Sequence, residues 1–411
     1  MELKRIQIPV IDNTEKKKQL IDKIEVTTLT ILKQICNSQI PKISYQRRNS
    51  EINLSKSTSI ALNDCDDCPL LLVSCDESPN RTFSDNIVEI DSFDELTNLT
   101  KDSSSQQTET IVDFSTISGR KQLTRMMTIL SKAHKLLLSN KIQTKRSLYY
   151  ELKSEESTLF ENERVVDYQI NSVAKLLECS TWDLGLIATS KGLVAGNLKL
   201  FFENNDTIFC DVLEGCLVPQ LMSSNMGQLT AIETTAKSII VVEKEAIFNK
   251  LMSEKCPEKL DSILITGKGY PDTATRIFVK TLVDKLELPV FVLVDCNPHG
   301  FEIMCTYRYG SLNLWWERKE LKCLKIKWIG IYPTEIPFFF LKRLPLTDND
   351  LKKLDALEKR TYLTDDERNE LKLMRHGKVE IEAVATNNFI SMDYLTSVYI
   401  PMKIRRLTHT N

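Results

Sequence analysis

Three apolar stretches decide the fold of this chain: SIIVVE at residues 238–243, SILITGK at residues 262–268 and PVFVLVD at residues 289–295. Each stretch has the length of a strand, and each is followed by a segment with the apolar spacing of a helix. Strands that alternate with helices are typical of a parallel sheet with crossover connections. The sequence therefore predicts an α/β fold for this part of the chain.

Two acidic residues, Glu243 and Asp295, stand at the ends of two of these strands. In parallel sheets the chemistry lies at the carboxyl ends of the strands. Mg²⁺ takes oxygen ligands and usually binds one or two carboxylates together with water. An acid after a strand more often caps a helix or faces solvent, so the pair by itself is only a hypothesis for a metal site.

The glycines of TGKGYPD and of NPHG would let the backbone approach a phosphate closely, and Lys268 could contact one. Ordinary turns use the same residues. TGKG also lacks the spacing of a Walker A loop, so the sequence does not support a nucleoside triphosphatase.

A basic segment precedes the strands. Residues 119–150 contain eight Lys or Arg residues and no Asp or Glu, although the whole chain of 411 residues has a formal charge of −2. Apolar residues at helical spacing predict short helices with a basic exterior, as in helix-turn-helix proteins that bind DNA. Contact with DNA is therefore expected from this segment and not from the bulk charge.

The basic segment ends in TKRSLYY, with Tyr149 and Tyr150 at its end. A phenol has an ordinary pKa of about 10, so a nucleophilic tyrosine needs a cation beside it. On a helix Arg146 and Tyr150 share a face at the spacing i, i+4, and Tyr149 lies close to that face. A tyrosine pair is more often a packing feature, and spacing does not choose between the two hydroxyls.

The N-terminal part predicts one amphipathic helix and a linker. Ile21, Ile24, Ile31 and Ile35 form an apolar stripe in residues 15–36, which favours packing on the helix's own domain over docking to a partner. Residues 46–110 are rich in Ser, Thr, Asn and Asp and are predicted to be mostly linker. Their CxxC motif, at residues 65–68, has no second pair at zinc-finger spacing, so a structural zinc is not favoured.

Further along the chain, Asn162 is the expected N-cap of a helix over residues 164–178. The stretch LGLIATSKGLVAGNLKLFF then predicts a β-hairpin wing, and a capping box from Thr364 to Glu367 predicts a helix in the charged tail. Eleven scattered cysteines, an N-terminus without a signal-peptide core and apolar runs far below the roughly 18 residues of a membrane span indicate a protein of the cytosol or nucleus.

In their order along the chain, these motifs resemble the family of the Spo11 meiotic recombination proteins and the topoisomerase VI A subunit. The resemblance runs from about residue 119 to residue 403 and is carried by TKRSLYY, FENERVVD, SKGLVAGNLK, VVEKEA, ITGKGYPDTATR, VDCNPHGFEIMCTYRYGS, KVEIEA and SMDYLTSVYIP.

The resemblance implies an α/β protein in which a CAP-like winged-helix domain is followed by a Toprim domain. Residues 1–110 would be an N-terminal extension, residues 111–205 the winged-helix domain and residues 206–411 the Toprim domain with C-terminal helices. The implied site residues are Tyr150 as nucleophile, Arg146 beside it, Glu243, Asp295 and Asn297 at Mg²⁺, and Lys191 and Tyr270 near DNA.

Two positions depart from the family's pattern. The family usually has an aspartate after the arginine, where this chain has Ser147, and the second acid of its D-x-D motif is Asn297 here. An asparagine keeps one carbonyl oxygen as a ligand but removes a negative charge. This change is expected to weaken Mg²⁺ binding or to remove a second ion.

The implied function is a nuclear, topoisomerase-like transesterase that makes double-strand breaks in meiotic DNA. Tyr150 would form a 5′-phosphotyrosyl bond and release a 3′ hydroxyl. The implied partners are double-stranded DNA, a second copy of the chain, a topoisomerase VI B-like subunit in a heterotetramer, and meiotic accessory proteins, with no membrane role.

Two alternatives remain open at this point. One is a somatic type IIB topoisomerase A subunit that works with an ATPase partner. The other is a catalytically silent DNA-binding scaffold, which Ser147 and Asn297 motivate. The retention of Tyr150, Arg146, Glu243 and Asp295 argues against it.

Overall fold

The computed structural model of the chain describes residues 3–46, 109–211, 214–221, 227–310, 321–385 and 393–408. The linker predicted between residues 46 and 110, with its CxxC motif, lies almost entirely outside these residues. The helices are α1 (Thr14–Cys36), α3 (Ile117–Leu138), α4 (Lys145–Glu155), α5 (Glu163–Leu177), α6 (Glu245–Ser253), α7 (Cys256–Lys259), α8 (Thr273–Leu286), α9 (Pro298–Tyr309), α11 (Asp348–Glu358), α12 (Asp365–Met374), α13 (Ile381–Ala385) and α14 (Ile400–Thr408).

Most of the strands are short. They are β1 (Lys4–Gln7), β2 (Lys42–Gln46), β3 (Glu109–Asp113), β4 (Gln143–Thr144), β5 (Leu186–Ile187), β6 (Leu193–Ala195), β7 (Leu198–Phe202), β8 (Thr207–Phe209), β9 (Cys216–Leu217), β10 (Leu229–Thr234), β11 (Ser238–Val242), β12 (Ser262–Thr266), β13 (Val290–Leu293) and β14 (Ile326–Gly330).

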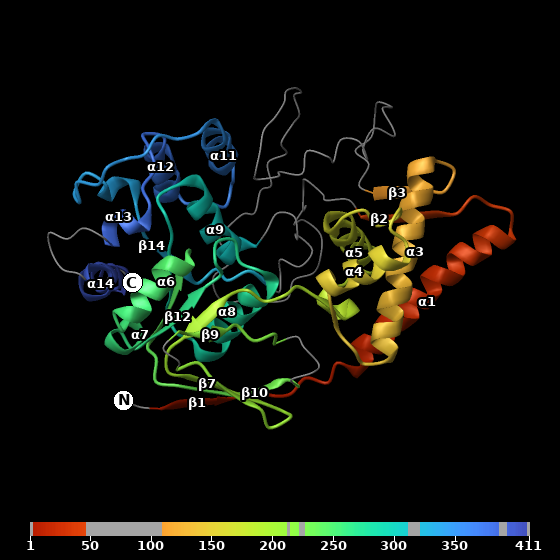
Figure 1. The fold of residues 1–411 in the computed structure, drawn as a ribbon, viewed down its shortest axis with the longest axis horizontal. Helices are drawn as coiled ribbons and strands as arrows, with labels where there is room; N and C mark the ends of the chain where they lie inside the picture. The colour runs from red at the N-terminus through yellow and green to blue at the C-terminus, as the bar shows by residue number, and fades with distance from the viewer. Residues whose placement is uncertain are drawn as a thin grey trace, which may run out of the picture.

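The chain builds two hydrophobic cores, and we name the two units after their contents. The helical unit packs α1, α3, α4 and α5 with two small sheets, the antiparallel pair β2 and β3 and the parallel pair β4 and β5, and the sheet unit holds the two larger sheets and the remaining helices. The two units lie at opposite sides of Figure 1, the helical unit on the right. Buried residues of the helical unit run up to Leu186, and those of the sheet unit begin at Val194.

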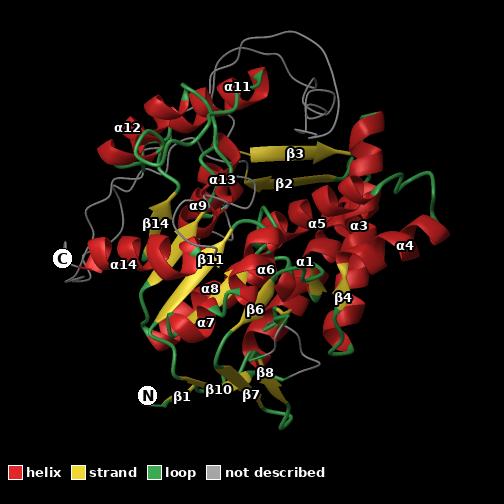
Figure 2. Ribbon diagram, turned by 60° about the vertical axis from the view of Figure 1, so that its left-hand side comes forward, coloured by secondary structure: helices red, strands yellow, loops and turns green. Residues whose placement is uncertain are grey.

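A six-stranded sheet forms the centre of the sheet unit, in the order β14-β13-β11-β12-β6-β9. The four strands β14, β13, β11 and β12 run parallel to one another, which confirms the predicted parallel sheet (Figure 2). Every residue of β11, β12 and β13 is buried. Strands of this kind are covered on both faces, which explains why they are continuously apolar and do not alternate.

The predicted β-hairpin wing is wrong. Its strands belong to different sheets: β5 pairs with β4, β6 pairs with β12 and β9, and β7 pairs with β10 and β8. Strand β6 covers the edge of the parallel sheet that β12 would otherwise expose. Gly196, at φ +121°, turns the chain against the carbonyl of Ser262, where a Cβ would approach within 2.6 Å, so the glycine redirects the chain to a second sheet.

That second sheet is antiparallel, with the order β1-β10-β7-β8. It ties the N-terminus of the chain to the sheet unit, because Lys4 pairs with Thr234 and Gln7 with Ala231. The chain then crosses to the helical unit, where α1 packs (Figure 1). Residues 3–46 therefore contribute to both units.

Several helices predicted from the sequence are confirmed. The side chain of Asn162 accepts a hydrogen bond from Val165 at the start of α5, and Thr364 and Glu367 form the capping box of α12. The basic segment forms one long helix, α3, and the shorter α4, where only short helices were predicted. No helix within the described residues is long and apolar enough to cross a membrane.

Candidate functional site

Helix α4 separates the roles of the two tyrosines. The side chain of Thr144 accepts a hydrogen bond from the Ser147 N–H and so begins the helix. Tyr149 then points into the core of the helical unit and is 8% exposed, whereas Tyr150 is 54% exposed. The two tyrosines therefore differ in exposure, a difference that spacing could not predict.

Arg146 lies beside this exposed hydroxyl. Its Nη2 donates to the Tyr150 oxygen at 3.5 Å, and its Cζ lies 5.9 Å from the centre of the Tyr150 ring. Nε of the same guanidinium is 3.5 Å from Oε1 of Glu163, at the start of α5. The predicted pairing of Arg146 and Tyr150 on one helical face is confirmed, and Glu163 restrains the arginine from a second helix.

Part of the basic segment is used for internal contacts. Lys132 of α3 forms ion pairs with Glu151 and Glu155 of α4, and Arg125 donates to the carbonyl of Leu159 at 2.6 Å. The ion pairs of Lys132 hold the helix that carries Tyr150 against the long helix α3, while Arg125 holds the loop after that helix. Two of the cations predicted for DNA contact are therefore used inside the helical unit.

The acids Glu243 and Asp295 meet at the carboxyl edge of the large sheet, as predicted. Oε2 of Glu243 accepts a hydrogen bond from the backbone N–H of Asp295 at 2.9 Å, and Oδ1 of Asp295 accepts one from the Ile381 N–H at 2.8 Å. Both side chains are buried. Burial, together with the nearby negative charge of Glu243, raises the pKa of Asp295 above its ordinary value, because both disfavour its charged form.

Two further acids complete this cluster, and sequence reasoning assigned them no role. Glu380 and Glu382 place carboxylate oxygens within 4.8 Å of each other and of Asp295. An antiparallel bridge between Cys296 and Val379 brings their segment to the sheet edge. The motif KVEIEA contains both residues, and its alternating glutamates are the one sequence signal that could have pointed to them.

Asn297 is used differently from an acidic ligand. Its Oδ1 accepts the Gly300 N–H at 2.8 Å and caps α9, while its Nδ2 lies 3.5 Å from Oδ2 of Asp295. One of the two lone pairs of the carbonyl oxygen that could bind a metal is thus used to cap the helix. The amide group instead faces Asp295, where it adds no negative charge.

Gly300 is expected to tolerate no side chain. An added Cβ would lie 2.5 Å from the carbonyl oxygen of Asp295 and 2.9 Å from Oε2 of Glu243. Alanine usually stabilises a helix interior, but here the clash should lower the free energy of unfolding by about 1–3 kcal/mol. Denaturant unfolding of Gly300→Ala measures this loss, and a Mn²⁺ titration should show weaker binding. An unchanged protein on both counts would contradict the close approach.

The loops that carry Lys191 and Tyr270 lie next to the acidic cluster. The backbone N–H of Gly269 donates to the Glu243 carbonyl at 2.8 Å, so the loop after β12 is fixed to the strand end that carries Glu243. Lys191 joins this loop from the chain before β6, since its Nζ donates to the Lys268 carbonyl at 3.3 Å. The residues that the resemblance places near DNA therefore border the acids.

Tyr270 is held by a charged network. Its hydroxyl donates to Oε2 of Glu302 in α9 at 2.5 Å, and Glu302 also pairs with Lys353 and Arg360. Burial acts to raise the pKa of Glu302, but its bonds to Lys353 and Tyr270 and the charges of Lys353 and Arg360 outweigh burial and lower the pKa to about 2. The ionised carboxylate thus stabilises the fold.

This network predicts a pH dependence of stability. Because the folded-state pKa of Glu302 is below its ordinary value of 4.5, its contribution is complete above about pH 4.5 and is lost as the pH falls towards 2. Glu302→Gln should cost about 3 kcal/mol of unfolding free energy at neutral pH, and the difference from wild type should shrink between pH 5 and 2. Urea unfolding across this range measures it, and a difference independent of pH would contradict the assignment.

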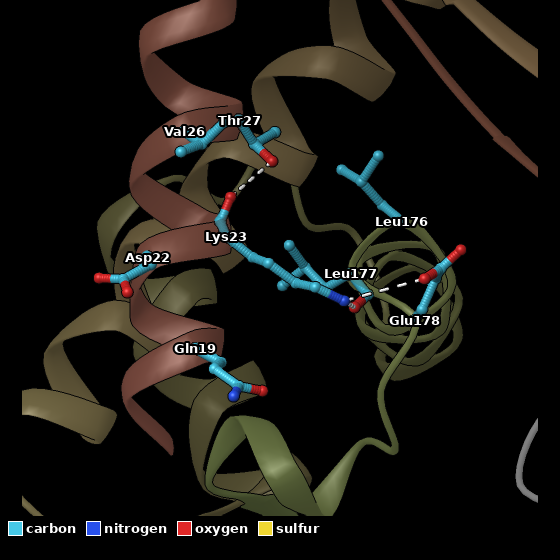
Figure 3. A pocket seen from close by; sticks show the side chains of 8 residues that line it. All are labelled: Gln19, Asp22, Lys23, Val26, Thr27, Leu176, Leu177 and Glu178. Carbon is cyan, nitrogen blue, oxygen red and sulfur yellow. Dashed lines mark hydrogen bonds and ion pairs between the residues drawn. The ribbon is translucent and has the colours of Figure 1, made fainter. Parts of the chain in front are cut away.

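A shallow groove lies on the helical unit between α1 and α5 (Figure 3). Val26, Leu176 and Leu177 give it apolar walls. Lys23 crosses the groove and donates to the Leu177 carbonyl at 3.1 Å, with Glu178 3.8 Å from its ammonium. Helix α1 thus packs on its own unit, as the sequence favoured, and keeps a second face towards solvent.

That second face is apolar. Val26, Leu29, Leu32 and Ile35 of α1 are each at least half exposed, while Leu20, Ile24 and Ile31 are buried against the helical unit. An exposed apolar face of this kind is typical of a helix that binds another protein.

Two protein-family models match this chain. A model of the Toprim domain shared by Spo11 and the topoisomerase 6 A subunit matches residues 238–404, and a model of type IIB DNA topoisomerase matches residues 121–186. Toprim domains are metal-binding folds, and the match covers the whole acidic cluster.

Three relatives illustrate the range of similarity. The human meiotic recombination protein SPO11 is 39% identical over 287 residues, which cover 68% of this chain and 70% of the human protein. The meiotic recombination protein W68 of Drosophila melanogaster is 34% identical over 299 residues, covering 72% and 86%. The DNA topoisomerase 6 A subunit of Arabidopsis thaliana is 31% identical over 304 residues, covering 72% and 69%. With two family models and relatives of this similarity, the chain belongs to the family of Spo11 and topoisomerase 6 A subunits.

Proposed function

We propose that this chain is a nuclear, topoisomerase-like DNA transesterase that makes double-strand breaks in meiotic DNA and so initiates homologous recombination. The observation that carries the proposal is the exposure of the Tyr150 side chain beside Arg146, while Tyr149 is buried. A hydroxyl that is accessible and close to a fixed cation is suited to attack a phosphodiester.

The proposed step moves one bond at phosphorus. The Tyr150 oxygen loses its proton and attacks a backbone phosphate, the bond from phosphorus to the 3′ oxygen breaks, and the 3′ oxygen leaves and takes up a proton. The chain is then attached to a 5′ phosphate, and the bond energy is retained in the phosphotyrosyl ester. Arg146 supports the phenolate and the negative charge on phosphorus during the exchange.

The acidic cluster fits Mg²⁺, because its donors are carboxylate oxygens, which this ion prefers. Glu243 and Asp295 would hold the ion, with Glu380 and Glu382 close to it. When bound, Mg²⁺ supplies positive charge for the phosphate backbone and the leaving oxygen. Asn297 contributes by capping α9, and we propose that its side chain stays on the helix.

A dimer is part of the proposal. Tyr150 belongs to the helical unit and the acids to the sheet unit, and each unit has its own hydrophobic core. We propose that the tyrosine of one copy works with the acids of another, as the family resemblance implies, so that two sites cut two strands. Lys191 and Tyr270, which border the acids, would contact the DNA backbone with little preference for base sequence.

The exposed apolar face of α1 is the proposed docking site for a topoisomerase VI B-like subunit. Four half-exposed apolar side chains lie on this face, from Val26 to Ile35. Such a subunit would complete a heterotetramer with two copies of this chain, and meiotic accessory proteins would join this assembly. A somatic topoisomerase A subunit would need an ATPase as the partner bound to α1. Whether the co-purified partner hydrolyses ATP therefore distinguishes a somatic topoisomerase from a meiotic break-forming protein.

The test is recovery of covalent DNA. The chain is purified under denaturing conditions from meiotic cells, and any attached DNA is labelled at its 3′ ends with a polymerase. Label that moves with the chain and is released as free DNA by a protease supports a 5′-phosphotyrosyl bond. No label from cells with confirmed breaks would contradict the proposal and favour a silent scaffold.

A further inference from the structure

One lysine lies inside the acidic cluster. Nζ of Lys244 is 2.9 Å from Oδ2 of Asp295 and 3.0 Å from Oε2 of Glu382, and it also donates to Glu380. These carboxylates come from two segments that are far apart in the sequence. All three carboxylates form an ion pair with the same ammonium group.

The position of Lys244 is set by the fold. It directly follows Glu243 and stands at the N-cap of α6, so its backbone is fixed at the end of β11. The side chain is 28% exposed, whereas that of Asp295 is 1% exposed. The ammonium therefore reaches from the surface into the cluster and occupies the space that the three carboxylates enclose.

A lysine ammonium and a divalent cation exclude each other from this space. Both need the same carboxylate oxygens, and at separations near 3 Å their like charges would repel strongly in a partly buried site. Removing the ammonium without a replacement would leave three acids close together, which is also unfavourable. The three carboxylates therefore need one cation among them, and this cation can be either the lysine ammonium or a divalent metal ion.

We propose that Lys244 is the resident cation of the metal-free site and that a divalent ion binds only when it displaces this ammonium. The inference rests on the proposed metal site and adds a competition that sets its affinity. A long, partly exposed lysine side chain can move its charge into solvent at small cost. In the metal-free chain Lys244 holds the segment with Glu380 and Glu382 against Asp295, so the site is formed before the ion arrives.

The competition predicts an unusual direction for a lysine substitution. Lys244→Met in the full-length chain should bind Mn²⁺ roughly tenfold more tightly than wild type, because ligand charge strongly tunes the affinity of carboxylate sites. Isothermal titration with Mn²⁺ alone measures this without DNA. In the Lys244→Met background, Glu380→Gln or Glu382→Gln should weaken binding again, since each removes a carboxylate from the cluster.

Lys237→Met is the matched control. Lys237 precedes the same strand, β11, at its other end and pairs with Asp261, so the substitution changes the net charge equally but leaves the cluster untouched. Its Mn²⁺ affinity should equal that of wild type. Equal affinity of Lys244→Met and Lys237→Met, with Mn²⁺ still bound, would overturn the inference and leave the metal site standing. Absence of binding by wild type and every variant would overturn both.

A second measurement uses the wild-type chain and does not depend on the stability of a variant. Displacement by the ion should free the ammonium, so acetylation of Lys244 by a mild acylating reagent should accelerate several-fold when Mn²⁺ is added, as read by mass spectrometry. Lys237 serves as the internal reference, and its rate should stay constant. An unchanged or slower rate at Lys244 with Mn²⁺ bound would overturn the inference.

Discussion

Replacing Tyr150 by phenylalanine is expected to abolish covalent attachment of DNA to this chain. The substitution removes one oxygen atom and keeps the ring, so the change is confined to the proposed nucleophile. Loss of a nucleophile typically costs roughly 10⁴-fold or more in rate. The exposed side chain makes few packing contacts, and unfolding stability should change little. End-labelling of DNA attached to the denatured chain measures the effect.

Tyr149→Phe is the matched control for this experiment. Its ring is buried in the core of the helical unit, and phenylalanine preserves that packing. Covalent attachment should stay close to the wild-type level, and both variants should bind duplex DNA with the same dependence on salt. Attachment that persists in Tyr150→Phe and disappears in Tyr149→Phe would exchange the two roles and contradict the assignment from exposure.

Spacing found the tyrosine pair but could not choose within it. The helical repeat placed Arg146 and Tyr150 on one face, and α4 confirms this. Which ring faces the core depends on how α4 packs against α3 and α5, and that is a property of the tertiary structure. That Glu243 and Asp295 lie close together was easier to predict from the sequence, because the carboxyl ends of neighbouring parallel strands must meet at one edge of the sheet.

Long-range contacts explain what the sequence did not predict. The Ile381 N–H that bonds to Asp295 is 86 residues away in the chain, and the bridge that positions it involves single residues. The alternation in KVEIEA does not show which distant residues the segment meets, so Glu380 and Glu382 were given no role. The wrong prediction of a β-hairpin has the same cause. Strands β6 and β7 pair with strands of two different sheets, β12 and β10, that are distant in the sequence.

Asp295→Asn is expected to reduce DNA cleavage strongly, in this case by weakening the metal site and not by removing the nucleophile. Asparagine keeps an acceptor for the Ile381 N–H, so the fold should persist, but it removes the charge at the centre of the cluster. Loss of ion-held transition-state stabilisation should reduce covalent attachment by roughly 10²–10³-fold or more. Mn²⁺ titration should show weakened binding in parallel, and normal cleavage by this variant would remove Asp295 from the proposed site.

Mixed dimers of the two variants then decide how the units cooperate. In a dimer of Tyr150→Phe with Asp295→Asn, cleavage between copies leaves one intact pair, namely Tyr150 of one copy and Asp295 of the other. That dimer should nick one strand and attach to it. If each copy used its own tyrosine with its own acids, both sites would be broken and no nick would form. Because the helical and sheet units carry these residues separately, we expect single-strand nicks from the mixed dimer and none from either variant alone.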